Sequence, residues 1–138
     1  MNCLCLDVGT KTIGVARGRR DVGLAQPLLT LSRQSVRKDS ERLHQLCKEQ
    51  KATIVVVGLP IMLDGTEGRS ARLARQIGAA LEAFGSYQIF YQDERFSTVE
   101  AERRLIASGK SAKKRKQEID QAAAAVILEH WFQEHPLT

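Results

Sequence analysis

Four acidic residues of this sequence stand next to strongly apolar segments, where a carboxylate needs a compensating partner. Asp7 lies inside LDVGTKTIGVA (6–16), Asp93 and Glu94 directly follow YQIFYQ (87–92), and Asp120 precedes a run of alanines and aliphatic residues. An ionised carboxylate in apolar surroundings is costly unless a metal ion, a lysine or hydrogen-bond donors compensate it. These acids are therefore candidates for catalysis or metal binding, with Asp7, Glu94 and Asp120 as first choices and Asp93 in second rank.

Three carboxylates gathered at one point repel one another unless cations bind between them. Hard oxygen ligands suit Mg²⁺ or Mn²⁺. Two such ions about 3.5–4 Å apart can activate a water and stabilise the leaving oxygen of a phosphodiester. Metal-dependent hydrolysis of a phosphodiester is the chemistry that this set of acids predicts.

Each acid also has a structural explanation that the sequence leaves open. Lys11 or the amides of the adjacent turn could hold Asp7, and Asp93 could cap a turn while Glu94 points inward. Asp120 could complement the dipole at the start of a helix, a common role worth about 0.3–1 kcal/mol. The joint pattern carries more weight than any single acid.

Basic residues accompany the acids in a protein with a formal net charge of +5 and a pI near 9.4. Such a charge suits a polyanionic partner. The alternative, for any single run of basic residues, is that it is a solvated loop without a partner. Few aromatic residues are expected at the surface, which favours recognition of backbone and shape over base stacking. The candidate phosphate-binding residues are Lys11, Arg69, Arg95, Lys113, Lys114, Arg115 and Lys116.

The elements that must position these residues follow from the pattern of apolar residues. We expect strands over 2–8, 12–16, 23–31, 53–59 and 87–91, and helices over 35–50, from the end of the 61–68 loop to near Gly85, over 97–108, and from about residue 119 onward. Thr66 and Ser97-Thr98 are expected to cap the second and third helices. A polar, basic stretch, 110–118, would precede the last helix.

This order places three antiparallel strands ahead of two parallel strands that are joined by crossover helices. It predicts an α/β, ribonuclease-H-like fold with a five-stranded mixed sheet. Ligands sit at the carboxyl ends of parallel strands, where Asp7 and the Asp93-Glu94 pair would lie. If the last helix packs on the sheet, Asp120 joins them.

Length and composition bound the remaining possibilities. A chain of 138 residues fits one domain, 1–138, and contains no apolar run long enough to span a membrane. The first residues lead straight into a strand pattern without the features of a signal peptide, so a cytoplasmic location is expected. Cys3, Cys5 and Cys47 are expected to be buried, reduced thiols.

Five segments resemble the YqgF/RuvX family, Holliday-junction resolvase-like proteins that are also described as pre-16S rRNA nucleases. They follow in the family's order and cover nearly the whole chain: LDVGTKTIGVA (6–16), VVGLP (56–60), DGTEG (64–68), YQDERFSTVEA (91–101) and KKRKQEIDQAAAAVIL (113–128).

The resemblance implies a ribonuclease-H-like, divalent-metal nuclease that processes the 5′ end of the small-subunit rRNA precursor in the cytoplasm. By motif match, its metal-binding acids would be Asp7, Glu94 and Asp120. True junction resolvases carry their second acid at the end of the fourth strand, where this chain has VVGLP and no carboxylate. Asp64, a few residues further on, is a second-rank substitute.

Other functions remain to be separated from this one. A resolvase of branched DNA, or a nucleic-acid-binding factor without turnover, would use the same basic surface. The DVGT segment also resembles the phosphate loop of actin-like ATPases and sugar kinases, which need two related domains. The expected partners are structured RNA or branched DNA and ribosomal precursor particles, with no membrane, for a monomer or weak homodimer.

Overall fold

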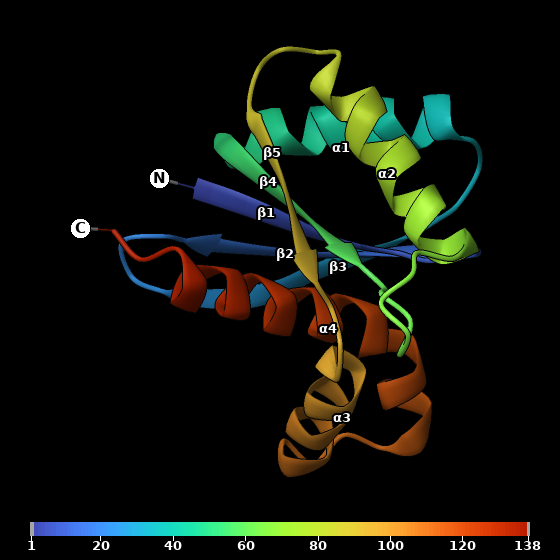
Figure 1. The fold of residues 1–138 in the computed structure, drawn as a ribbon. Helices are drawn as coiled ribbons and strands as arrows, with labels where there is room; N and C mark the ends of the chain where they lie inside the picture. Colours follow the sequence, from blue (N-terminus) through green and yellow to red (C-terminus); the bar gives the residue numbers. More distant parts are fainter. Residues whose placement is uncertain (1, 138) are drawn as a thin grey trace.

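A five-stranded mixed sheet forms the centre of the protein in the computed structural model, which describes residues 2–137 (Figure 1). The strands are β1 (Asn2–Val8), β2 (Thr12–Arg19), β3 (Leu24–Ser32), β4 (Ala52–Leu59) and β5 (Gln88–Asp93), in the order β3-β2-β1-β4-β5. β1, β2 and β3 pair antiparallel, whereas β4 is parallel to β1 and to β5. The predicted mixed sheet is confirmed.

Helices cover the two faces of the sheet unequally. They are α1 (Val36–Gln50), α2 (Arg69–Glu82), α3 (Ser97–Ala107) and α4 (Ala112–Glu134). Figure 1 shows α1 and α2 on one face and the long α4 on the other, with α3 beside the first half of α4 and beyond the end of β5. The two faces therefore have separate cores.

The alternation of side chains along β1 assigns Asp7 to the α4 face. Leu4, Leu6 and Val8 belong to the core beneath α1 and α2, while Cys3 and Cys5 belong to the core beneath α4. Successive side chains of a strand point to opposite faces, so Asp7 continues the series of Cys3 and Cys5. The acid thus emerges on the face that carries Asp120.

A glycine lets α4 approach the sheet closely at this position. Gly14 of β2 is the register partner of Asp7, and a Cβ on Gly14 would lie only 2.1 Å from the carbonyl oxygen of Asp120. Any side chain at position 14 would push the helix away from the strand. The contact of strand and helix backbones brings Asp120 toward the end of β1.

The last helix begins earlier than its sequence predicts. α4 starts at Ala112, where the Ser111 hydroxyl caps it by accepting a hydrogen bond from the Lys114 N–H at 3.3 Å. The prediction of a separating polar stretch over 110–118 was therefore wrong. Lysine, arginine and glutamine are good helix formers, so this segment lacks a reason to stop a helix once Ser111 caps it.

Other element ends also differ from their predictions. β2 continues to Arg19, and β5 continues to Asp93. Gly68 rather than Thr66 is the N-cap of α2, and Ser97 is the first residue of α3 rather than its cap. The Ser97 hydroxyl instead donates to the carbonyl oxygen of Glu94 at 2.7 Å, which ties the start of α3 to a candidate catalytic acid.

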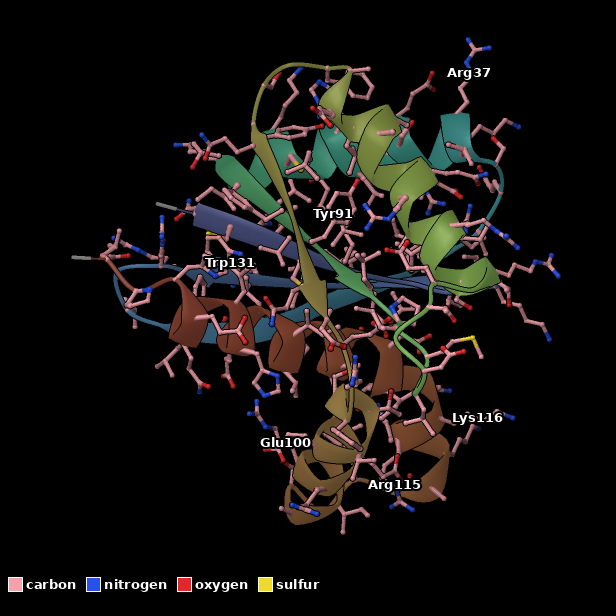
Figure 2. The ribbon with its side chains drawn as sticks, in the orientation of Figure 1. Arg37, Tyr91, Glu100, Arg115, Lys116 and Trp131 are labelled. Carbon is pink, nitrogen blue, oxygen red and sulfur yellow. The ribbon has the colours of Figure 1, made fainter. Side chains whose placement is uncertain are left out.

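Aromatic packing anchors the second half of α4. Trp131 is 1% exposed, and its ring centroid lies 5.1 Å from that of Phe90 on β5; its side chain lies between α4 and the sheet (Figure 2). Cys3, Cys5 and Cys47 are buried, and none of the three forms a disulfide. None of the helices within residues 2–137 has the length and apolarity needed to cross a membrane.

Candidate active site

Asp7, Glu94 and Asp120 converge from three elements onto the carboxyl-terminal edge of the parallel strands. Asp7 is the penultimate residue of β1, Glu94 directly follows β5, and Asp120 lies on α4. Burial raises the pKa of Asp7, and the nearby charge of Asp120 raises it further, while a hydrogen bond with Glu94 acts in the opposite direction. The three acids therefore lie close enough to influence one another's ionisation.

Glu94 reaches Asp7 by crossing the end of β4, which separates their strands. Its N–H donates to the Leu59 carbonyl at 3.1 Å, and its carboxylate passes over Gly58. A Cβ on Gly58 would lie 2.8 Å from Glu94 Oε2 and 2.9 Å from Ile127 Cδ1. The missing side chain at position 58 creates the space that the carboxylate occupies.

The pKa of Glu94 is strongly raised. Burial, followed by the charge of Asp7, raises its pKa to about 9. Its Oε2 atom is buried and has no hydrogen-bond partner in residues 2–137. A proton on Glu94 that bonds to Asp7 relieves the repulsion between the two carboxylates. A positive charge placed here would relieve it as well.

Asp120 is held by a hydroxyl group from β2. The Thr12 hydroxyl donates a hydrogen bond to Asp120 Oδ2. Because α4 begins at Ala112, Asp120 lies two turns inside the helix. The alternative in which Asp120 complements the dipole at the helix start was therefore wrong, since that effect fades within the first turn.

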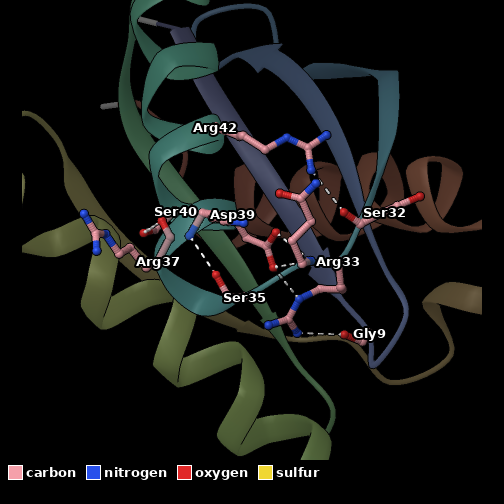
Figure 3. A network of polar contacts seen from close by, with 10 residues as sticks. Gly9, Ser32, Arg33, Ser35, Arg37, Asp39, Ser40 and Arg42 are labelled. Atoms are coloured by element: carbon pink, nitrogen blue, oxygen red, sulfur yellow. Dashed lines mark hydrogen bonds and ion pairs between the residues drawn. The ribbon is translucent and has the colours of Figure 1, made fainter.

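A buried ion pair supports the turn that follows Asp7 (Figure 3). Arg33 Nε lies 2.8 Å from Asp39 Oδ2, and Asp39 is 1% exposed. Arg33 also donates from NH1 to the Gly9 carbonyl at 3.0 Å, and its N–H donates to the Lys11 carbonyl at 2.8 Å. Charge-assisted hydrogen bonds of this kind are strong, so α1 fixes the turn between β1 and β2.

The two second-rank acids, Asp93 and Asp64, form hydrogen bonds within the turns that contain them. Asp93 accepts a hydrogen bond from the Arg95 N–H at 2.9 Å and pairs with Arg95 Nε at 3.0 Å. Asp93 thus caps the turn while Glu94 points inward, which is one of the alternatives that the sequence left open. Asp64 accepts from the hydroxyl of Thr66 at 2.6 Å and from its N–H at 3.0 Å, and the hydroxyl bond lowers the pKa of Asp64.

The basic run before Asp120 is divided between two faces of α4. Lys113 and Lys116 precede Asp120 by seven and four residues, so helical periodicity places all three on one stripe. Arg115 points toward α3, where its Nε lies 3.0 Å from Glu102 Oε1 and its NH1 donates to the Lys110 carbonyl at 2.8 Å. Figure 2 shows Arg115 and Lys116 at the first half of α4. Arg115 connects two helices, whereas Lys113, Lys114 and Lys116 are exposed.

The remaining predicted phosphate-binding residues differ in whether their side chains are already paired. Lys11 is exposed at the turn between β1 and β2, and Arg69 is exposed as the first residue of α2. Arg95 is exposed but is paired with Asp93. The Arg95 side chain would have to share its charge with Asp93 when it meets a phosphate, whereas no such ion pair is observed for Lys11 or Arg69 among residues 2–137.

Sequence reasoning missed three residues of this site, namely Thr12, Gly58 and Phe96. Thr12 and Gly58 matter because Asp120 and Glu94 approach them closely. These approaches depend on how the strands and α4 pack together, and the periodicity of the sequence does not reveal that packing. Phe96 is 75% exposed in the turn after Glu94 and is one of the few exposed aromatic side chains. Its position two residues after a candidate acid was the available signal.

The donor set suits a hard divalent cation. Within residues 2–137 no three histidine, cysteine or acidic side chains form a ready-made metal cluster, and Asp120 is turned toward Thr12. The three converging side chains nevertheless offer only carboxylate oxygens, the ligands that Mg²⁺ and Mn²⁺ prefer. The buried, unpartnered Glu94 Oε2 supplies an oxygen that such an ion would satisfy.

Sequence comparisons cover almost the whole chain. A family model described as "RuvX: Holliday junction resolvase" matches residues 1–134. A relative from Yersinia enterocolitica is 41% identical over 131 residues, covering 95% of this chain and 94% of its own length. Another from Actinobacillus succinogenes is 38% identical over 136 residues, covering 99% and 97%. Both bear the name "Putative pre-16S rRNA nuclease".

Structural comparisons identify the fold. RuvC from T. thermophilus in complex with a Holliday junction substrate matches with a TM-score of 0.64 at 16% identity, covering 97% of this chain and 94% of that chain. The Fowlpox virus resolvase in complex with Holliday junction DNA matches with a TM-score of 0.64 at 10% identity, covering 97% and 98%. At these identities the likeness concerns the fold, and it confirms the predicted ribonuclease-H-like architecture.

Proposed function

This chain belongs to the RuvX family, and we propose that it is a divalent-metal-dependent nuclease that hydrolyses phosphodiester bonds in the precursor of 16S rRNA. The observation that carries the proposal is the convergence of Asp7, Glu94 and Asp120 where Gly58 leaves room for a carboxylate. A stable core does not require three mutually repelling acids, so their gathering supports a catalytic role.

The carboxylates of Asp7, Glu94 and Asp120 would hold Mg²⁺ or Mn²⁺. When bound, such ions supply the positive charge that activates water for attack on phosphorus and stabilises the leaving oxygen. Thr12 orients the Asp120 carboxylate by donating to Oδ2. A proton held between Asp7 and Glu94 would have to leave when a cation binds, because the ligands are the ionised carboxylates.

Exposed cations around the acids would hold the nucleic-acid backbone. Lys116 and Lys113 lie about 6 Å and about 10.5 Å before Asp120 along the axis of α4, given the rise of an α-helix. They would contact phosphates next to the scissile one, and Lys11 and Arg69 would contact others. Such contacts position the substrate without reading its sequence.

The names of the relatives favour ribosomal precursor RNA as the substrate. The protein would bind it in the cytoplasm, either as free RNA or within precursor particles. The relative from Yersinia enterocolitica that bears this name is 41% identical over 95% of the chain, so the similarity extends over nearly the whole protein. Branched DNA serves as a comparison substrate, because the similarity to junction resolvases is a similarity of fold.

A substrate panel tests this proposal. Purified protein is incubated in Mg²⁺, Mn²⁺ or EDTA with an RNA that spans the 5′ end of 16S rRNA and its leader, a single-stranded RNA of equal length, and a four-way DNA junction. The proposal predicts metal-dependent cutting of the precursor RNA in preference to the other two. Preferential cutting of the junction would reassign the substrate, and binding without cutting would indicate an assembly factor.

A further inference from the structure

Phe96 occupies a position where a large apolar side chain has no structural benefit. It is 75% exposed, and its backbone lies in the left-handed region with φ 63° and ψ 3°. This conformation favours glycine and is unusual for a bulky residue. Residues held in this way concentrate at functional sites, where the surrounding structure enforces the strain.

The surrounding turn fixes the position of Phe96. The Ser97 N–H donates to the Glu94 carbonyl at 3.1 Å, and the Glu100 N–H donates to the Phe96 carbonyl at 3.1 Å. Ser97 is only 2% exposed, and Arg95 is held by Asp93. The aromatic ring is therefore presented to solvent by a rigid turn whose first residue is a proposed catalytic acid.

The neighbouring loop presents apolar side chains at the same edge of the sheet. Met62 and Leu63 are 57% and 94% exposed in the loop between β4 and α2. β4 and β5 are adjacent and parallel, so the loops that follow them leave the sheet at one edge. Exposed apolar groups beside the acids and among exposed cations suit a ligand that has both flat apolar surfaces and phosphates.

We propose that Phe96 stacks on a nucleobase adjacent to the scissile phosphate. This inference deepens the proposed function and rests on it for the identity of the substrate. A single-stranded nucleic acid combines a phosphate backbone with unstacked bases, and aromatic side chains bind such bases by stacking. The rigid turn would place the ring at a fixed position relative to Glu94, so that one stacked base sets which phosphate reaches the acids.

Binding of short fluorescent RNAs in EDTA tests the stacking without requiring cleavage. One probe is a single-stranded RNA, and the other has the same length and backbone but abasic nucleotides. The variants are Phe96→Ala, Phe96→Gly and Phe96→Tyr, with Ile106→Ala as the matched control. Ile106 is 55% exposed in the last turn of α3, far along the helix from Glu94.

We expect Phe96→Ala and Phe96→Gly to weaken binding of the single-stranded RNA about tenfold, as the loss of one stacked base predicts. Phe96→Tyr and Ile106→Ala should stay within about threefold of the wild type, and all variants should bind the abasic probe alike. Phe96→Gly relieves the backbone strain, so its thermal midpoint should equal or exceed that of the wild type. Weaker binding by this variant would then not reflect misfolding.

Equal affinity of Phe96→Gly and Ile106→Ala for the single-stranded RNA would overturn the inference. An equal loss on the abasic probe, or no measurable RNA binding by the wild type, would overturn it as well. A wild type that binds RNA through Phe96 yet cuts no substrate would contradict the proposed nuclease function while supporting the stacking role. The two proposals can therefore fail separately.

Discussion

Glu94 Oε2 lies 2.8 Å from the point that a Cβ on Gly58 would occupy. A side chain at position 58 and the observed position of the Glu94 carboxylate exclude each other, because real Cβ contacts are longer than this. The end of β4 carries no acidic residue. Because position 58 is a glycine, the carboxylate of Glu94, which follows the neighbouring strand β5, can lie over the end of β4. The proposed acid set of this chain is thus completed by the residue that follows β5 instead of by a residue of β4.

Gly58→Ala should displace Glu94 and lower nuclease activity by about tenfold or more, because misplacing a catalytic group by about 1 Å can cost a hundredfold. The measurement is kcat/KM on the precursor RNA together with the thermal midpoint. Gly78→Ala is the matched control, since its Cβ would lie 2.2 Å from Tyr91 Oη on the other face of the sheet. It should lower stability and leave kcat/KM within about threefold; similar activity losses in both variants would contradict the role of Gly58.

Thr12→Val should weaken metal binding and activity by about 10- to 100-fold, the range for removing a group that orients a metal ligand. The valine keeps the β-branched shape but cannot donate to Asp120 Oδ2. Thr30→Val is the control, because Thr30 donates at 3.1 Å to Gln121, the neighbour of Asp120 on α4. The half-saturating Mg²⁺ concentration for cleavage is the readout, and equal values for the two variants would refute a positioning role for Thr12.

Stability without divalent ions should fall as pH rises, and Glu94 should cause part of the fall. Its pKa is raised from an ordinary 4.5 to about 9 in the folded protein. The folded state therefore binds this proton more tightly than the unfolded chain, and the stabilisation present below pH 4.5 is lost as pH rises through about 9.

The variant Glu94→Gln isolates this contribution. Between about pH 5 and about pH 9 in EDTA, the free energy of unfolding of the wild type should fall by about 1–3 kcal/mol more than that of the variant, the cost of an unsatisfied buried polar group. Urea titrations at each pH measure it. Parallel pH profiles for the two proteins would show that Glu94 does not carry the shifted titration.

Replacing Lys113 and Lys116 together by alanine should reduce the salt dependence of RNA binding. Each lost phosphate contact lowers the slope of log K against log salt by about 0.7 for single strands and about 0.9 for duplexes, so the pair should lower it by about 1.4–1.8. The double variant Lys38→Ala and Lys48→Ala removes equal charge from α1 on the opposite face. An unchanged slope in the first double variant would exclude phosphate contacts by these two lysines.

The sequence predicted those parts of the site that depend on strand periodicity. Alternation in NCLCLDV places Asp7 beside Cys3 and Cys5, and the apolar run 53–59 indicates a parallel strand covered on both faces. Because parallel strands end at one edge, Asp7 and Glu94 were expected to meet. Local patterns determine these features, so they can be read without knowledge of the packing.

Features that depend on packing between elements could not be predicted in the same way. The start of α4 at Ala112 follows from a cap at Ser111 and from Arg115 meeting Glu102 on α3. The functions of Gly14 and Gly58 appear only once α4 and Glu94 lie over them. Periodicity reports which face a residue occupies, whereas it does not report how closely two backbones approach.

The most direct test of the catalytic site compares the wild type with Asp7→Asn on the precursor RNA. Asparagine matches aspartate in shape but cannot supply the negative charge that a divalent cation needs. Cleavage is followed in Mg²⁺ and in Mn²⁺, and RNA affinity is measured in parallel. We expect cleavage to be lost while affinity is kept or improved, because a negative charge near phosphate is removed. Equal cleavage by the two proteins would contradict this expectation.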